Sequence, residues 1–333
     1  MPLSPDEVKS LQERRQRALA LPLVPDAVLA PTAPPLQLEA LTPTANDFDA
    51  FSSPAISLAL ESPNPYRPFK HALRSVVSRR SGWRSRRFRL FDGLCLNKSS
   101  PAQVWRVEVS SDGEVLGMAV LKLVVEAIFS GLLVDSGEWT PACEAVKSEL
   151  RAYAALRPVQ GRDVPHCYGA FPFLHPSGEA VAGILLEDLS TTAVPASPYC
   201  KREREAGRLQ SANEIDPLVA ATFCTLHRLQ RLNVARFKLG AFDVLILDSS
   251  SSSGSPHLVF LDFTPTISGD EAARIEAEDR AKSPLTKPWQ ALDEYKVNHL
   301  MKRLVPDVWA EWFSRELEEK RLPLFQHEWS RAA

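Results

Sequence analysis

The residues of this chain that could do chemistry are a lysine, a glutamate and two aspartates, each inside or beside a patterned segment. Lys122 lies within an apolar run, and Glu149 lies in a helical pattern further along the chain. Asp243 begins a second apolar run, and Asp262 lies in a third. An ammonium group on a rigid strand can neutralise phosphate, and a carboxylate after a strand can bind Mg²⁺. These four residues are therefore candidates for a phosphate and metal site.

Two of these candidates also have purely structural interpretations. A lysine can lie on an edge strand and point to water, and an aspartate after a strand can cap a turn. The residues around Lys122 are apolar on both faces, which is typical of a central strand; they are Val120, Leu121, Leu123 and Val124. We therefore favour a binding role for Lys122, and both interpretations stay open for Asp262.

The first part of the chain is rich in predicted strands. We expect strands at Arg87–Leu96, Gln103–Ser110, Glu114–Val124 and Gly183–Leu189, and a helix at Glu144–Leu156. Ser111, Asp112 and Gly113 mark a hairpin turn, because the glycine can take a positive φ.

The second part is mostly helical. Apolar residues recur every three or four positions from Ile215 to Leu229, which predicts a long helix. Two apolar strands, Asp243–Leu247 and His257–Phe263, follow it. The chain from Trp289 is again helical, with a final helix that opens at Pro306. Strands followed by helices with one embedded hairpin predict an α+β fold in two parts.

The N-terminal region predicts one helix and then a leader. Ser4, Pro5 and Glu7 form a helix start with a capping box, and the helix should run to about Ala20. From Leu21 to Pro68 prolines recur too often for regular structure, so we expect a mostly disordered or surface-draped segment.

The order of these elements and their motifs resembles the protein-kinase-like superfamily, including the atypical kinase-like domains of fungi. The resemblance covers about Phe88 to Leu304 and rests on Ala-Val-Leu-Lys ending at Lys122, Val-Pro-His-Cys-Tyr-Gly ending at Gly169, and Leu-Asp-Phe-Thr around Asp262. It implies a leader at 1–68, a β-rich N-lobe with the hinge at 69–189, and a helical C-lobe at 190–333.

The resemblance also implies that the protein binds ATP with Mg²⁺. Lys122 would bind the α- and β-phosphates and pair with Glu149, with Glu144 as the fallback partner. Glu187 and Leu189 would lie in the hinge, where backbone groups hold adenine.

The catalytic loop departs from the family in charge. Asp243 and Asp262 would bind the metal. When the loop is aligned with the family from Asp243, Arg236 occupies the place of the family's histidine, and Lys238 occupies that of its catalytic aspartate. An ammonium cannot accept a proton near neutral pH. His227, inside the predicted long helix, is assigned a structural role.

Two further segments depart from the family pattern. The loop expected to cover the phosphates, Asn97–Ala102, has no glycine, so Ser99 and Ser100 would have to compensate through their hydroxyls. Thr264 stands where the family has the glycine after Asp-Phe, and no Ala-Pro-Glu motif follows.

Composition limits the class of protein and its partners. The chain has 333 residues, 44% of them hydrophobic, and a formal net charge of -2, which argues against general nucleic-acid binding. Its five cysteines have no metal-ligand spacing, no apolar run is long enough for a membrane span, and no signal peptide is evident. We therefore expect a cytoplasmic or nuclear protein with an unknown protein partner and no membrane partner.

Three functions remain open at this point. The first is a pseudokinase that binds Mg-ATP and acts as a regulatory or binding module. The second is an active ATP-dependent phosphotransferase with an unconventional catalytic loop. The third is a scaffold that binds no nucleotide, which the glycine-free loop would favour. Binding of Mg-ATP separates the third function from the other two, and transfer of the γ-phosphate separates the first from the second.

Overall fold

The computed structural model describes residues 4–35, 67, 73, 83–95, 102–128, 142–232, 234–236, 243–247, 256–263, 266–267 and 297–318. The chain divides into two compact units. The first holds the described residues up to Gly161 together with Pro165–Asp188, and the second holds Arg162–Val164 and the described residues from Leu189 onward. Among the helices in these ranges, none combines the length and the apolar character needed to cross a membrane.

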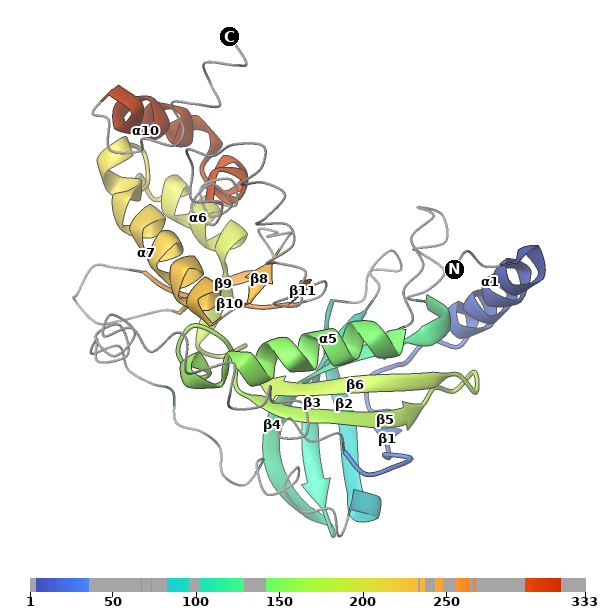
Figure 1. The fold of residues 1–333 in the computed structure, drawn as a ribbon. Coiled ribbons are helices and arrows are strands. Elements are labelled where there is room, and N and C mark those ends of the chain that lie inside the picture. Colours follow the sequence, from blue (N-terminus) through green and yellow to red (C-terminus); the bar gives the residue numbers. More distant parts are fainter. Residues whose placement is uncertain are drawn as a thin grey trace. The chain divides into compact units, whose positions relative to one another are not determined.

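The first unit is built on an antiparallel sheet of six strands (Figure 1). Its strands are β1 (Val28–Leu29), β2 (Arg86–Cys95), β3 (Gln103–Ser111), β4 (Glu114–Val125), β5 (Cys167–Leu174) and β6 (Ala180–Glu187). Their order in the sheet is β1-β2-β3-β4-β6-β5. The predicted turn joins β3 to β4, with φ of 52° at Asp112 and 83° at Gly113. Two successive positive φ values give a turn whose twist matches that of the paired strands.

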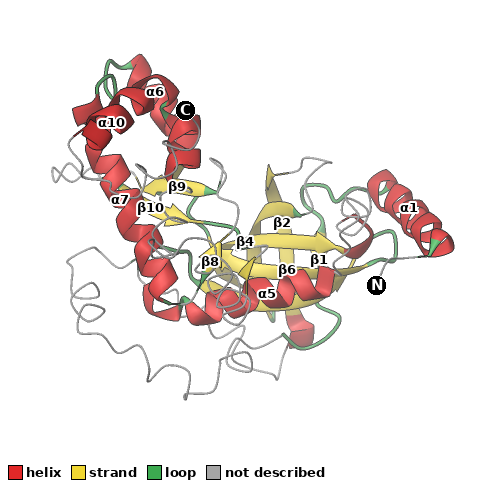
Figure 2. Ribbon diagram, turned by 45° about the horizontal axis from the view of Figure 1, so that its top comes forward, coloured by secondary structure: helices red, strands yellow, loops and turns green. Residues whose placement is uncertain are grey.

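The helix α5 (Ala142–Ala155) packs against β4, β5 and β6 of this sheet (Figure 2). Along β4, Ala119, Leu121 and Leu123 are fully buried in the hydrophobic core of the unit. Successive side chains of a strand point to opposite faces of the sheet. Lys122, between two of these core residues, therefore points to the opposite face.

The N-terminal helix α1 (Pro5–Ala20) forms as predicted, with both hydrogen bonds of the capping box between Ser4 and Glu7. The segment after it contains a short strand. β1 pairs with β2, and Leu23 and Leu29 are buried in the sheet's core. Of the two expectations for the leader, disordered or draped on the surface, the second agrees with residues 21–35, because a two-residue edge strand and two leucines attach them to the sheet despite the prolines. The rest of the predicted leader, apart from Arg67, lies outside the described residues.

The second unit combines short strands with helices. β7 (Ala193–Pro195), β9 (Val244–Leu247) and β10 (His257–Phe260) form a sheet in the order β10-β9-β7, and β8 (Ala235–Arg236) pairs with β11 (Thr266–Ile267). The helices of this unit include α6 (Ala196–Glu205), α7 (Ala212–Arg231) and α10 (Pro306–Glu318), and residues 297–304 are also helical. α10 packs on α7, where the Trp312 indole N–H donates to the Asp216 carboxylate.

The predicted fold class is confirmed. An antiparallel sheet with one covering helix is followed by a helical unit that contains the predicted β9–β10 hairpin, which is the element order of a two-lobed protein-kinase-like fold. The division between the units falls between Asp188 and Leu189, within the segment predicted as the hinge.

The stability of the first unit should fall as the pH drops below about 6.5 because of His175. Burial lowers the pKa of this imidazole below its ordinary value of 6.5, and its Nδ1 accepts the Ser177 backbone N–H at 3.2 Å. As the pH falls, the imidazole is protonated in the unfolded chain before it is protonated in the folded one. Above the ordinary pKa of 6.5 His175 therefore does not change the free energy of unfolding, and this free energy decreases as the pH falls from 6.5 to the lowered pKa of the folded state. His175→Asn keeps an acceptor and removes the titration. Urea unfolding of this variant should show a weaker dependence on pH in that window, and an unchanged dependence would contradict the assignment.

Candidate functional site

Lys122 lies on a central strand. Val104 of β3 and Ile184 of β6 are its partners on the two neighbouring strands. This position excludes the alternative of an edge-strand lysine that points to water. The residue is only 7% exposed, although it carries a charge. A buried ammonium needs a compensating partner, because removal from water costs it solvation free energy.

Glu149 on α5 is that partner. The Lys122 Nζ lies 2.7 Å from the Glu149 Oε2, and the two side chains are 9% and 1% exposed. Ala145, Leu150 and Tyr153 are buried on the same helix, so packing of its apolar residues fixes the position of the carboxylate. The predicted pairing is present in the structure, and its role in nucleotide binding remains a prediction.

Glu144, the fallback partner, lies elsewhere on the same helix. Its carboxylate accepts a hydrogen bond from Lys147 at 2.7 Å, in a solvent-exposed pair one turn apart. That hydrogen bond lowers the pKa of Glu144. Glu149 is thus the residue that the helix directs toward Lys122.

Two adjacent carboxylates at the end of β6 are each held by an arginine. The Arg67 Nε and Nη2 donate to the two carboxylate oxygens of Glu187 at 2.9 and 3.2 Å. The Arg106 Nε on β3 donates to Asp188 at 2.9 Å. The Glu187 and Asp188 side chains are 7% and 4% exposed. Sequence reasoning missed both arginines, since Arg67 lies in the proline-rich leader and Arg106 in an ordinary alternating strand.

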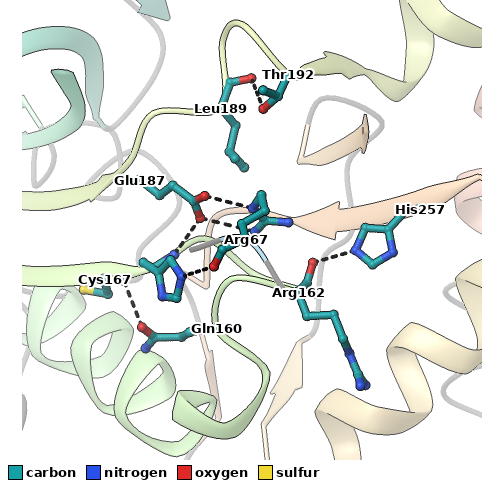
Figure 3. Close-up of polar contacts among 9 residues, drawn as sticks. Arg67, Gln160, Arg162, Cys167, Glu187, Leu189, Thr192 and His257 are labelled. Atoms are coloured by element: carbon teal, nitrogen blue, oxygen red, sulfur yellow. Dashed lines mark hydrogen bonds and ion pairs between the residues drawn. The ribbon is translucent and has the colours of Figure 1, made fainter. Parts of the chain in front are cut away.

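The backbone at the two predicted adenine-binding residues is also ordered by hydrogen bonds. In the first unit, the Glu187 N–H donates to the His166 carbonyl at 2.9 Å. In the second unit, the Leu189 carbonyl accepts the N–H groups of Thr192 and Ala193 at 3.0 and 2.9 Å. Figure 3 shows the contact between the Thr192 hydroxyl and the same carbonyl. Contact of these residues with adenine remains a prediction.

The β9–β10 hairpin brings the backbone segments at Asp243 and Asp262 next to one another. The register pairs Val244 with Phe260, and beyond it the Leu261 N–H donates to the Asp243 carbonyl at 2.7 Å. Asp262 is the next residue. The hairpin therefore places both aspartates at the same end of one strand pair, as predicted. Metal binding by this pair of residues remains a prediction.

Asp262 has an unusual backbone conformation. Its φ is 56°, in the left-handed region that residues other than glycine rarely adopt, although aspartate tolerates it better than most. The next residue, Phe263, is fully buried. Such conformations persist only where the surroundings enforce them, and they cluster at functional sites. The turn-capping interpretation of Asp262 also fits this geometry and stays open.

A buried ion pair in the second unit anchors β10, and sequence reasoning missed it. The Arg228 guanidinium on α7 donates to both carboxylate oxygens of Asp163, at 2.8 and 2.7 Å, and the Asp163 carbonyl accepts the Phe260 N–H at 2.8 Å. The His257 Nε2 lies 2.8 Å from the carbonyl oxygen of Arg162 (Figure 3). Arg228 belongs to the His-Arg-Leu segment, which lies inside α7 as predicted for the long helix. The structural role assigned to His227 remains a prediction.

Several predicted site residues cannot be placed with the others. Lys238, Ser99 and Ser100 lie outside the described residues. Arg236 is described by its backbone, which pairs with Thr266 between β8 and β11. In the part of the chain that the structure describes, no three metal-ligating side chains form a group that could hold an ion.

The Lys122–Glu149 pair should be coupled in stability. Lys122→Met and Glu149→Gln should each lower the free energy of unfolding by about 3–5 kcal/mol, because each leaves one buried group without its opposite charge. The double variant should lose less than the sum, because both substitutions remove the same interaction. Urea unfolding of the four proteins measures this coupling. Glu144→Gln with Lys147→Met is the matched exposed control and should show no measurable coupling, whereas additive losses for the buried pair would contradict the assignment.

Comparison with known proteins gives only a coarse similarity in structure, over part of the chain. No family model matches the chain, and no curated protein matches it either. Among solved structures, the chain is similar to two mutant forms of the PknI kinase domain of Mycobacterium tuberculosis, each with a TM-score of 0.39 and 12% identity. For the double mutant the match covers 66% of this chain and 76% of that chain, and for the single mutant it covers 68% and 76%. Similarity this low assigns no role to any residue.

Proposed function

We propose that this protein is a kinase-like pseudokinase that binds Mg-ATP and acts as a regulatory or binding module without efficient phosphoryl transfer. The observation that carries the proposal is the buried ion pair between Lys122 and Glu149. A buried pair of this kind adds little net stability, because desolvation of the two charges offsets their attraction. It does fix the position of an ammonium group, which is what binding of a polyphosphate needs.

The roles of the nucleotide-binding residues follow from this pair. Lys122 would neutralise the α- and β-phosphates, while Glu149 holds its ammonium in place. The backbone at Glu187 and Leu189 would hold adenine. Ser99 and Ser100 would contact phosphate through their hydroxyls, with a weaker hold than a glycine-rich loop because fewer backbone N–H groups can approach closely.

The two aspartates fit a Mg²⁺ ion. This ion prefers oxygen ligands and is commonly bound by one or two carboxylates together with substrate phosphates. Asp243 and Asp262 supply two carboxylates from one end of the β9–β10 hairpin. Bound Mg²⁺ would neutralise the phosphate charge, and the two residues would hold and orient it.

The catalytic loop supports the pseudokinase over the active enzyme. Lys238 would stand where a general base is needed, with Arg236 nearby in the sequence. Loss of a general base typically costs about 10²–10⁴-fold in rate. A cationic side chain can still neutralise a γ-phosphate, so this loop is suited to retaining ATP. The output would then be recognition of the nucleotide-bound form by a protein partner.

Mg-ATP should raise the midpoint of thermal unfolding of the wild-type protein. A ligand at 100 times its Kd stabilises the folded state by about 2.7 kcal/mol. Lys122→Met should reduce the shift with or without Mg²⁺, whereas Asp262→Asn should reduce its Mg²⁺-dependent part, because only the second change removes a metal ligand. Asp112→Asn, in the exposed β3–β4 turn, is the control and should keep the full shift. A wild-type protein with no shift at millimolar Mg-ATP would favour the nucleotide-free scaffold.

Phosphoryl transfer should separate the pseudokinase from an active enzyme. We expect phosphoryl transfer from ATP to an acceptor by the wild-type protein to be undetectable or no faster than hydrolysis of ATP. Lys238→Asp restores a carboxylate and should make nucleotide binding more dependent on Mg²⁺, because three like charges then need a cation. Robust transfer that Lys238→Ala leaves unchanged would refute the assignment of the catalytic loop. Robust transfer that Lys238→Ala abolishes would identify an unconventional kinase that uses Lys238 electrostatically.

A further inference from the structure

Arg67 is bound to the first unit through both its backbone and its side chain. Its N–H donates to the Gly161 carbonyl at 2.9 Å, and its carbonyl oxygen lies 3.1 Å from the His166 Nε2. Because a carbonyl only accepts hydrogen bonds, the His166 Nε2 must be the donor. The guanidinium forms the bidentate pair with Glu187 (Figure 3). We use the name arginine socket for Gly161, His166 and Glu187, which all contact Arg67.

The socket is shaped for close approach of the Arg67 backbone. Gly161 has a φ of 78°, and a Cβ placed there would lie 2.3 Å from the His166 Nε2 and 3.1 Å from the Arg67 carbonyl oxygen. Any other residue at this position would be strained in conformation and would push the imidazole away from Arg67. The absence of a side chain at Gly161 therefore lets one carbonyl and one imidazole engage the same residue of the leader.

The socket is also linked to the end of β6. The Glu187 Oε2 accepts the His166 backbone N–H at 3.1 Å in addition to the bond from Arg67. The Glu187 N–H in turn donates to the His166 carbonyl at 2.9 Å. Charge-assisted bidentate pairs define orientation as well as energy. The Arg67 and Glu187 side chains are 13% and 7% exposed, so their ion pair has little contact with solvent.

The arginine comes from a distant part of the chain, 120 residues before Glu187. The other described part of the N-terminal region is bound to the same unit at different places. Arg14 of α1 pairs with Glu179, and β1 pairs with β2. The N-terminal region is thus attached at separate points, and among its described residues Arg67 is the one that contacts Glu187, the residue assigned to adenine binding.

We propose that Arg67 is a positioning residue for the adenine end of the nucleotide site, and that the N-terminal region controls nucleotide affinity by occupying the arginine socket. The inference rests on the proposed function, since it assigns Glu187 to adenine binding. With Arg67 in the socket, the Glu187 carboxylate is neutralised and the end of β6 is fixed. Without it, a buried carboxylate loses its cation, and the β6 end shifts to reach water or another partner.

Two measurements on the full chain test this proposal. Hydrogen exchange without nucleotide should speed up at the His166 and Glu187 amides in Arg67→Ala. Affinity for Mg-ATP should fall about tenfold, within the roughly 5–150-fold range of typical coupling between sites. Affinity for Mg-tripolyphosphate, which has no adenine, should stay within about twofold of wild type. Arg67→Lys keeps the charge without the bidentate geometry, so it should fall between wild type and Arg67→Ala and serves as the test if the alanine variant does not fold.

Arg14→Ala is the matched control, because it removes an arginine of the same N-terminal region that pairs with Glu179 outside the socket. It should leave exchange at both amides and the affinity for Mg-ATP unchanged. Unchanged exchange at the two amides in Arg67→Ala would overturn the socket as a positioning device. Equal losses for Mg-ATP and Mg-tripolyphosphate would overturn its link to adenine. Failure of the wild-type protein to bind either ligand would overturn the proposed function and the link to adenine with it, while hydrogen exchange still decides the positioning role.

Discussion

A lysine side chain that is nine-tenths buried can keep its charge only if a carboxylate lies within contact distance, and much of the first unit serves that requirement. The central position of β4 removes Lys122 from water, and α5 must then cover the same face of the sheet to bring Glu149 to 2.7 Å. The opposite face of β4 is filled by leucines of the core, which fix the strand's register. The strand order of the sheet and the position of α5 are therefore both linked to the contact between Lys122 and Glu149.

At the end of β6, too, buried charged groups have partners of opposite charge. Glu187 and Asp188 are both buried, and each has a guanidinium from another segment of the chain. Arginine suits such positions, because its planar fork meets both oxygens of a carboxylate and stays charged. Without its arginine, each buried carboxylate would lose solvation free energy with no compensating charge. The arginines therefore define both the charge and the conformation of the segment that leads to Leu189.

Much of the fold could be predicted from local patterns. The apolar periods of β4 and α7, the turn at Asp112 and Gly113, and the capping box at Ser4 each depend on neighbouring residues, and all of them form as expected. Lys122 and Glu149 could be paired because the resemblance to kinase-like proteins implies this pair and the patterns of β4 and α5 locate its two residues. Arg67 could not be identified, since Gly161, His166 and Glu187, which it contacts, lie far away in the sequence and its own neighbours are proline-rich. β1 was missed for the same reason, as two residues pair only because β2 offers an edge.

The division of the chain between its two units bears on the order in which it can fold during synthesis. Arg162–Val164 belong to the second unit, although the residues on both sides of them belong to the first. The Asp163 carboxylate pairs with Arg228, and its carbonyl accepts the Phe260 N–H. Both partners lie in the second unit and are made only after Asp188, the last residue of the first unit. Of the described partners of the Asp163 carboxylate, the neighbouring Arg162 is the one made before that point. Attachment of Arg162–Val164 to the second unit is therefore a late event that depends on residues made after Asp188.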